Sequence, residues 1–412
     1  MSRPSDHVDG ERLWSRLMDL ARFGARADGG VDRPALSAAE GEARAQVIAW
    51  GRAIGLTPFT DAAANLFLRL EGTDPSLPPV VSGSHTDSQP TGGKFDGAFG
   101  VLAALEALEA IIASGQRPHR TIEVVAWTNE EGSRFAPGMT GSHLFTGQMA
   151  LADAEALKDA QGVTAGDAIA AILAGDDNVA VRPFGWPVSA YIEPHIEQAS
   201  VLERAGKPLG VVTGIQGTRR YRVTVTGEAA HAGTATREER RDALLAAVRM
   251  IGAMEIAANS VDDFKFTVGM FNVTPNAPSV VPQEVLFSID IRHPDNAAVD
   301  GFDETMRRIV EAEQGPCDAV VRQIVHAASL EFPLAIRQSI SRHAAALGID
   351  GMDVYSAAGH DARQMHYFCP SGMIFVPCRN GISHSPEEWA EPAHLAGATR
   401  LLADLLWDLA NT

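Results

Sequence analysis

The hydrophobic and polar positions of the first 210 residues predict helices that alternate with strands. Apolar residues recur at helical spacing over residues 11–25, and Ser37 and Glu40 have the spacing of a capping box that opens a second helix, ending near residue 54. Strands are expected at residues 65–70, 80–81 and 121–127, and a helix at residues 99–114. Because strands alternate with helices, the pattern indicates an α/β fold whose parallel or mixed sheet is covered on both faces.

The pattern changes after residue 214. An alternating strand at residues 220–226 is followed by a long helix, for which Thr236 and Glu239 have capping-box spacing. The elements expected next are strands at residues 265–272, 284–292 and 317–326 and a helix at residues 296–314. This β-α-β-β-α-β order is that of a ferredoxin-like domain with helices on one face. We therefore expect an inserted domain at residues 213–328, flanked by the two parts of a first domain, residues 1–212 and 329–412.

The composition is that of an acidic globular protein. The 412 residues include 34 Lys and Arg against 52 Asp and Glu, a formal charge of −18, which disfavours nucleic acid or an anionic membrane as a partner. No uninterrupted apolar run reaches the ~18 residues that a membrane span needs. Acidic first residues without an apolar stretch disfavour a secretory signal, and three scattered cysteines do not make a disulfide framework, so a cytoplasmic protein is expected.

Two polar motifs follow the short strand at residues 80–81. In the first, His85 lies on a loop where a metal ion can reach it, and Asp87 is placed to hold the second ring nitrogen of that histidine. In the second, Asp96 lies in a glycine-rich turn directly before a predicted helix. Asp96 therefore has two interpretations, a metal ligand or the N-cap of the helix.

A pair of adjacent carboxylates, Glu130 and Glu131, follows the strand at residues 121–127. Two neighbouring carboxylates repel each other when they are buried, and a bound cation removes that repulsion. Because neighbouring residues point in different directions, one of the pair can bind a metal ion while the other faces a substrate. A solvated acidic turn is the alternative interpretation.

Two histidines at the ends of apolar strands add to these acidic groups. His195 ends one strand, and His384 lies in a polar loop after the strand at residues 373–376. With His85, Asp96 and one of the paired glutamates, they form a set of nitrogen and oxygen donors drawn from five strand-end loops. Such a set suits two neighbouring divalent ions, and zinc, manganese, cobalt and nickel all accept it.

Six short motifs, five of which contain these residues, lie in order between residues 80 and 390. They are residues 83–87, 92–97, 127–132, 193–198, 231–234 and 380–385. In these motifs the chain resembles the hydantoinase/carbamoylase family of the aminoacylase and carboxypeptidase-like dinuclear metallohydrolases. That family includes N-carbamoyl-L-amino acid hydrolases, β-ureidopropionases and allantoate amidohydrolases. The resemblance implies a mixed-sheet metallohydrolase catalytic domain with an inserted lid or dimerisation domain, and a homodimer formed through the insert.

The resemblance also implies the roles of individual residues at a centre of two divalent ions, zinc or manganese, with cobalt and nickel as alternatives. One ion would be bound by His85 and His195, the other by Glu131 and His384, with Asp96 bridging the two and Glu130 acting as the general base. Substrate contacts would come from Gln198 and from two residues of the insert, His231 and Arg292. The planar fork of an arginine matches a substrate carboxylate.

Two departures from the family pattern fall in the insert. Ser279 stands where the family usually has an asparagine before Val-Val-Pro, which puts an amide contact to the substrate in doubt. Asn276 is close enough in sequence to replace that contact. After residues 231–234 the family tends to continue Thr-Pro, whereas this chain has Ala235 and Thr236.

The reaction implied by the resemblance is metal-dependent hydrolysis of a carbamoyl (ureido) C–N bond. The substrate would be an N-carbamoyl-L-amino acid or N-carbamoyl-β-alanine, and the products the amino acid, carbon dioxide and ammonia. Glu130 would activate the water, and His231 together with a metal ion would stabilise the developing oxyanion. Three alternatives stay open: an allantoate amidohydrolase, an N-acyl amino acid deacylase or peptidase, and a metal-binding protein without activity.

Overall fold

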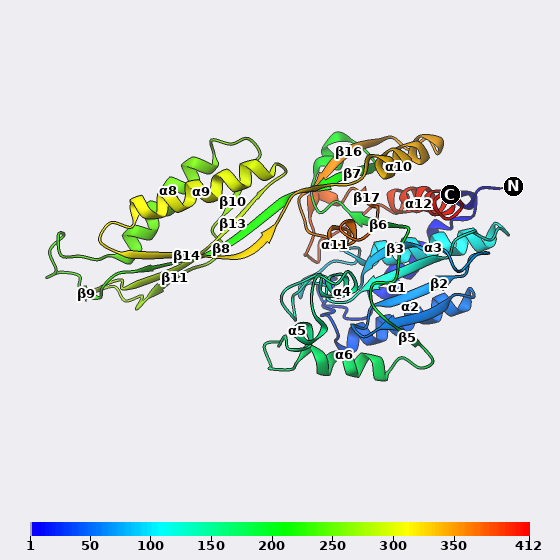
Figure 1. The fold of residues 1–412 in the computed structure, drawn as a ribbon, viewed down its shortest axis with the longest axis horizontal. Helices are drawn as coiled ribbons and strands as arrows, with labels where there is room; N and C mark the ends of the chain where they lie inside the picture. Colours follow the sequence, from blue (N-terminus) through cyan, green and yellow to red (C-terminus); the bar gives the residue numbers. More distant parts are fainter. Residues whose placement is uncertain (1) are drawn as a thin grey trace. The chain divides into compact units, whose positions relative to one another are not determined.

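The computed structural model describes residues 2–412 and divides the chain into two compact units (Figure 1). Unit 1 combines the residues up to Thr213 with Phe332–Thr412, and unit 2 is the stretch Gly214–Glu331 between them. The predicted α/β class with an inserted domain is confirmed. None of the helices formed by residues 2–412 has the length and apolar character needed to cross a membrane.

A ten-stranded mixed sheet has most of its strands in unit 1, in the order β15-β7-β17-β6-β3-β4-β2-β1-β5, with β16 also paired to β7; β15 and the last two residues of β7 fall within Gly214–Glu331. At its centre β3, β4, β6 and β17 run parallel to their neighbours in that group, and every residue of these four strands is buried. The strands are β1 (Thr57–Asp61), β2 (Leu66–Leu70), β3 (Val80–His85), β4 (Ile122–Trp127), β5 (Ala180–Arg182), β6 (Ala190–Ile196), β7 (Leu209–Ile215), β15 (Leu330–Glu331), β16 (Gly351–Ser356) and β17 (Ser371–Val376). Parallel strands of this kind end at one shared edge of the sheet.

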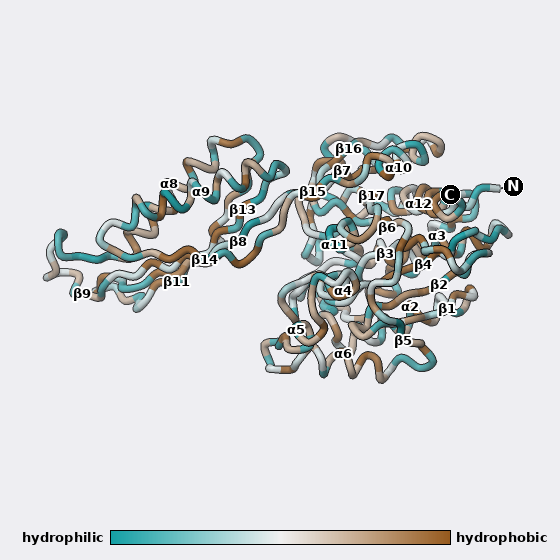
Figure 2. Tube along the Cα trace, in the orientation of Figure 1, coloured by the Kyte–Doolittle hydropathy of each residue, from teal (hydrophilic) through white to brown (hydrophobic). Residues whose placement is uncertain are grey.

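The core of unit 1 lies between this sheet and its helices, and hydrophobic segments gather around β2, β3 and β4 in Figure 2. The helices are α1 (Gly10–Leu20), α2 (Ala38–Ala53), α3 (Ala98–Ala113), α4 (Thr140–Phe145), α5 (Leu151–Glu155), α6 (Ala165–Ala174), α7 (Val201–Ala205), α10 (Leu334–Ala346), α11 (Asp361–His366) and α12 (Pro392–Ala410), with 3-10 turns at Pro4–His7 and Arg379–Gly381. Helix α3 is almost wholly apolar and buried. Its buried Glu106 is paired with Arg12 of α1 at 2.6 Å, which removes the penalty for an isolated charge.

Unit 2 is a five-stranded antiparallel sheet in the order β10-β13-β8-β14, with β11 paired to β13 and with α8 and α9 contributing to its core. Its elements are β8 (Gly217–Thr226), β9 (Ala230–His231), α8 (Ala243–Ala258), β10 (Lys265–Thr267), β11 (Phe271–Thr274), β12 (Val280–Val281), β13 (Glu284–His293), α9 (Asn296–Glu313) and β14 (Asp318–Ala327). The predicted β-α-β-β-α-β order is confirmed. The strand expected at residues 265–272 is two short strands, β10 and β11, and both pair with β13.

Two capping-box predictions had different outcomes. Ser37 caps α2 by accepting a hydrogen bond from the backbone N–H of Glu40, whose own carboxylate accepts from the N–H of Leu36. The prediction that Thr236 opens a helix was wrong. The Glu239 carboxylate does accept hydrogen bonds from Thr236, but the helix begins only at Ala243, capped by Asp242.

Candidate metal centre

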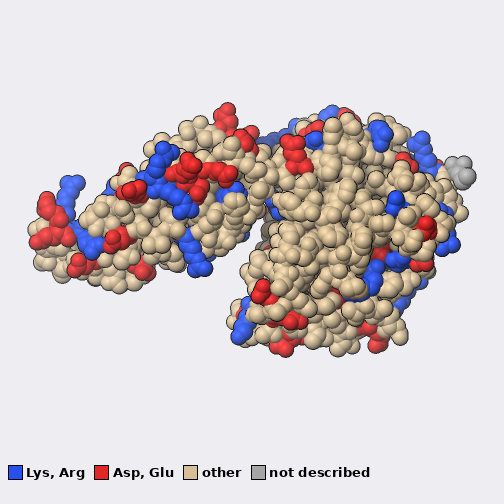
Figure 3. Space-filling model, viewed as in Figure 1, with Lys and Arg blue, Asp and Glu red and all other residues tan. Residues whose placement is uncertain are grey.

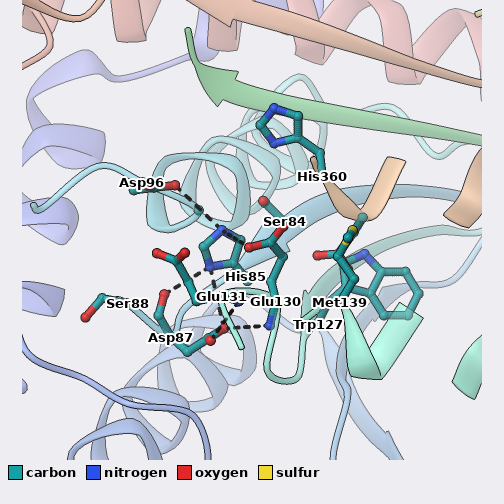
Figure 4. Close-up of polar contacts among 12 residues, drawn as sticks. Ser84, His85, Asp87, Ser88, Asp96, Trp127, Glu130, Glu131, Met139 and His360 are labelled. Atoms are coloured by element: carbon teal, nitrogen blue, oxygen red, sulfur yellow. Dashed lines mark hydrogen bonds and ion pairs between the residues drawn. The ribbon is translucent and has the colours of Figure 1, made fainter. Parts of the chain in front are cut away.

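The candidate ligands gather at the edge of the sheet where β3, β4, β6 and β17 end. His85 is the last residue of β3, and Glu130 and Glu131 follow β4. His195 lies near the end of β6, and the loop after β17 carries His384. The chain therefore brings together side chains that are almost 300 residues apart, and Figure 4 shows part of this cluster.

One group that can hold a metal ion consists of His85, Asp96 and His195, all buried. The Nδ1 atom of His85 lies 3.0 Å from the carbonyl oxygen of Asp87, and that of His195 lies 2.9 Å from the carbonyl oxygen of Ile196. Because a carbonyl oxygen only accepts hydrogen bonds, each Nδ1 carries a proton, and Nε2 is the ring nitrogen left to face the cluster. These Nε2 atoms face Asp96 at 3.7 and 3.2 Å, so both imidazoles are oriented as metal ligands.

A second group consists of Asp96, Glu131 and His384. The Nε2 atom of His384 lies 3.1 Å from Oδ2 of Asp96 and 3.4 Å from Oε2 of Glu131. Asp96 thus turns Oδ1 toward the first group and Oδ2 toward the second, which is the arrangement of a bridging carboxylate. The alternative that Asp96 caps the next helix was wrong, because α3 has Gly97 as its N-cap and no capping side chain.

The pKa values of the carboxylates in the cluster are shifted in opposite directions. Burial raises the pKa of Glu131 to about 7 and the pKa of Glu130 well above its usual range. Burial also opposes ionisation of Asp96, but hydrogen bonds from His195 and His384 lower the pKa of Asp96 well below its usual range. Several carboxylates crowded into one buried place require a compensating positive charge, and a nitrogen and oxygen donor set of this kind fits borderline divalent ions.

Asp87 supports the paired glutamates more directly than it supports His85. Its two carboxylate oxygens accept hydrogen bonds from the backbone N–H groups of Glu130 and Glu131, each at 3.2 Å. The predicted contact from this carboxylate to Nδ1 of His85 is 3.5 Å long, and the backbone carbonyl of Asp87 is closer. The carboxylate of Glu130 lies 3.6 Å from Nε2 of His85, beside the first group and outside both ligand sets.

Sequence reasoning missed three buried residues at the centre. Glu388 accepts hydrogen bonds from the backbone N–H groups of Phe95 and Asp96 at 2.8 and 3.1 Å and so fixes the loop that carries the bridging carboxylate. Glu193, His195 and His360 form a third group of side chains that could hold a metal ion. Glu193 already accepts three hydrogen bonds, from Ser84, Tyr191 and the N–H of Ala362. We therefore regard it as a support for β6 rather than a further ligand.

The predicted substrate contacts divide between the units. Gln198, in unit 1, donates its side-chain amide to Oδ2 of Asp96 at 2.8 Å. In unit 2 the β9–β12 ladder places His231 opposite Val280, and the carbonyl of Ser279 accepts from the N–H of Ala232. Asn276 lies two residues beyond the end of β11, which is paired with the start of β13.

Arg292 lies at the other end of β13, eight residues beyond Glu284, where it is paired with Asp290 at 2.9 Å. At the rise of a strand, eight residues span about 27 Å. His231 lies in the separate β9–β12 ladder, next to the Glu284 end of β13, so within one copy of unit 2 it is at the opposite end from Arg292. The structure does not bring these two predicted contacts together.

The fold and the two groups that share Asp96 define an α/β protein with a candidate centre for two metal ions. Residues 81–408 match the Peptidase family M20/M25/M40, and the chain belongs to this family. It is 38% identical to an N-carbamoyl-L-amino acid amidohydrolase of Geobacillus stearothermophilus, over 98% of this chain and 99% of that protein. It is 36% identical to an allantoate amidohydrolase of Bacillus subtilis, over 95% of each chain.

A solved structure has the same fold. The amidase of the hydantoinase/carbamoylase family from Burkholderia multivorans superposes with a TM-score of 0.88, at 39% identity, over 98% of this chain and 99% of that one. The resemblance to the hydantoinase/carbamoylase family is thus confirmed over nearly the whole chain.

The assignment of Glu131 as a ligand can be tested by metal analysis. Replacing Glu131 with glutamine should lower the affinity of one of two metal sites, because a neutral amide is a weaker ligand than a carboxylate. Loss of a group that only orients a ligand typically costs about 10–100-fold in affinity, so loss of the ligand itself should cost at least as much. Metal content would be measured after dialysis against graded concentrations of free metal. Glu387 is an exposed glutamate three residues after His384, so Glu387→Gln is the matched control and should keep both ions. Full metal occupancy in Glu131→Gln would contradict the assignment.

Proposed function

We propose that the protein hydrolyses the carbamoyl C–N bond of N-carbamoyl-L-amino acids. The observation that carries this proposal is the pair of donor groups sharing Asp96, with Glu130 beside them and outside both. Relatives named N-carbamoyl-L-amino acid amidohydrolases match over nearly the full chain, which supports this substrate class. A relative named allantoate amidohydrolase matches almost as well, so allantoate is the second candidate substrate.

His85 and His195 would hold one divalent ion and Glu131 and His384 the other, with Asp96 between them. Zinc and manganese are the first candidates, since both accept nitrogen and oxygen donors. When bound, two such ions lower the pKa of a water molecule and polarise a carbonyl oxygen.

The protein's own groups perform the proton transfers. Glu130 accepts a proton from the attacking water and returns it to the leaving nitrogen, while Asp87 fixes the backbone from which Glu130 projects. His231 donates a hydrogen bond to the developing oxyanion, and Arg292 binds the carboxylate of the substrate. The carbamate that leaves breaks down to carbon dioxide and ammonia, and the free amino acid is released.

We also propose that the protein is a homodimer formed through unit 2. Three apolar side chains on one face of α8 are exposed, Leu245 by 54%, Val248 by 53% and Ile256 by 75%. Exposed apolar stripes are typical of surfaces that another chain covers. In such a dimer, His231 and Arg292 of one site would come from different copies of unit 2.

Dimer formation can be tested on α8. Ile256→Asp should convert a dimer into a monomer, because it places a charge in the apolar stripe without touching the core of unit 2, from which this side chain points away. The mass in solution would be measured by light scattering. Gly301→Asp adds the same charge on α9, where an added Cβ atom meets no other atom within 4 Å, and should leave the mass unchanged. A dimer that survives Ile256→Asp would contradict the role of this stripe.

The function is tested by ammonia release from metal-loaded protein. The substrates are an N-carbamoyl-L-amino acid, N-carbamoyl-β-alanine, allantoate and an N-acetyl amino acid, the last assayed by release of the amino acid. We expect the highest kcat/KM with the N-carbamoyl-L-amino acid. A preference for allantoate would replace the first substrate by the second candidate, and a preference for the N-acetyl compound would contradict a carbamoyl-specific enzyme.

A further inference from the structure

The sheet of unit 2 has one face that is packed and one that is polar. Along β8, Tyr221, Val223 and Val225 are buried in the core that includes α8 and α9. The residues between them, Arg220 and Arg222 among others, point to the opposite face and are exposed. We call this second surface the open face.

The open face carries a pair of like charges that face each other. Arg222 of β8 stands directly opposite Arg322 of the edge strand β14, and on its other side Arg222 is opposite Ser288 of β13. Like charges directly opposite on neighbouring strands destabilise a sheet. Among residues 2–412 neither guanidinium has a carboxylate within ion-pair distance, so no acidic side chain offsets the repulsion.

Three more cations continue the pair along the same face. Arg220, one step along β8 from Arg222, and Arg292 are both paired with a single carboxylate, that of Asp290, at 2.6 and 2.9 Å. Lys265 of β10 stands opposite Arg292. These five residues form what we call the cationic strip: Arg220, Arg222, Lys265, Arg292 and Arg322.

The other acids of the open face lie at the far end of the sheet. Glu284 and Asp318 both stand opposite Thr226, four residues along β8 from Arg222, and Asp318 is paired with Arg241 at 2.7 Å. On the face of unit 2 seen in Figure 3, acidic and basic side chains are intermixed. The strip is thus a local concentration of cations on the open face, in a protein whose net charge is −18.

We propose that the cationic strip attracts carboxylate-bearing substrates and guides them to Arg292. This inference rests on the proposed function, in which Arg292 binds the substrate carboxylate. A protein of net charge −18 repels an anionic substrate over most of its surface, and a local excess of cations reverses the field where the carboxylate must arrive. Arg222 and Arg322 are two strand positions, about 7 Å, from the level of Arg220 and Asp290, and four positions, about 14 Å, from the level of Arg292. These separations are comparable with the ~10 Å over which charges interact at 0.1 M salt.

The test is the salt dependence of kcat/KM in a variant with Arg222→Glu and Arg322→Glu. At low ionic strength kcat/KM for an N-carbamoyl-L-amino acid should fall about tenfold, at the lower end of the range for electrostatic attraction of charged substrates. Near 0.5 M salt the difference should shrink below about twofold, since salt screens exposed charges. The value of kcat should stay unchanged at both salt concentrations. Glutamine at both positions changes the charge half as much as glutamate does. The logarithm of kcat/KM should therefore fall by about half as much in that variant.

A matched control separates guidance from net charge. Arg307→Glu with Arg308→Glu makes the same change of charge on α9, and should leave kcat/KM within about twofold. The carboxamide of the same N-carbamoyl amino acid has no carboxylate, and its kcat/KM should not respond to the Arg222 and Arg322 changes. An equal loss in the control, an equal loss with the carboxamide, or a loss that persists at high salt would each overturn the proposal.

The proposed function and the strip fail in different ways. Wild-type protein that releases no ammonia from any ureido substrate contradicts the proposed function alone. The strip is then tested by the binding of the N-carbamoyl amino acid to the same variants in equilibrium dialysis. Salt-dependent weakening of binding supports the strip, and unchanged binding overturns it.

Discussion

Replacing Glu130 with glutamine should lower kcat by about 10³-fold and leave both metal ions in place. The side chain lies outside both donor groups, so its loss removes no ligand. An amide has nearly the same shape as a carboxylate but cannot accept a proton from water, and removal of a general base typically costs about 10²–10⁴-fold. The measurement is ammonia release by the variant, with metal content determined on the same sample.

Glu131→Gln supplies the matched comparison, because the two residues are adjacent and both lie beside Asp87. We expect Glu130→Gln to keep its metal and lose turnover, and Glu131→Gln to lose metal and recover part of its turnover when the metal concentration is raised. The opposite pattern would mean that the ligand and the base are exchanged. Unchanged turnover in Glu130→Gln would exclude it as the base.

The sequence predicted most elements because their apolar periodicity is strong and local. The buried strands β3, β4 and β6 and the apolar helix α3 all lie within a few residues of their expected positions. The failure at Thr236 has a physical reason. Thr236 and Glu239 form their hydrogen bonds, but residues 236–241 contain no apolar side chain, so a helical turn there would bury nothing. The helix starts where Asp242 caps a run of alanine and leucine.

The candidate ligands were predictable because they end strands, and parallel strands bring their ends to one edge. The supporting residues were not predictable in this way. Glu388 lies in a polar turn that has the appearance of surface charge, and its contact with the Asp96 loop joins residues 292 positions apart. His360, in the loop before α11, packs its ring against the ring of His195. Contacts of this kind depend on the tertiary fold, of which a single sequence gives no local sign.

His231→Ala should lower kcat by about 10²-fold without loss of metal, the effect expected when one hydrogen-bond donor to an oxyanion is removed. The position of His231 makes a second and stronger test available. His231 lies in the β9–β12 ladder next to the Glu284 end of β13, and Glu284 is about 27 Å along β13 from Arg292. One substrate molecule cannot touch both within a single copy of this unit, so we expect His231 to serve the site of the partner copy.

Mixed dimers of two inactive variants test this directly. One copy carries Glu130→Gln and the other His231→Ala, each with a different affinity tag, so that the mixed species can be isolated. If His231 acts across the dimer, the copy with intact Glu130 receives its histidine from the other copy, and one of the two sites is restored. The mixed dimer should then have about half the activity of the wild-type dimer, far above either parent. If His231 acts within its own copy, both sites of the mixed dimer stay defective and activity remains at the level of the parents. Because metal content is intact in both variants, recovery depends only on which copy provides the imidazole.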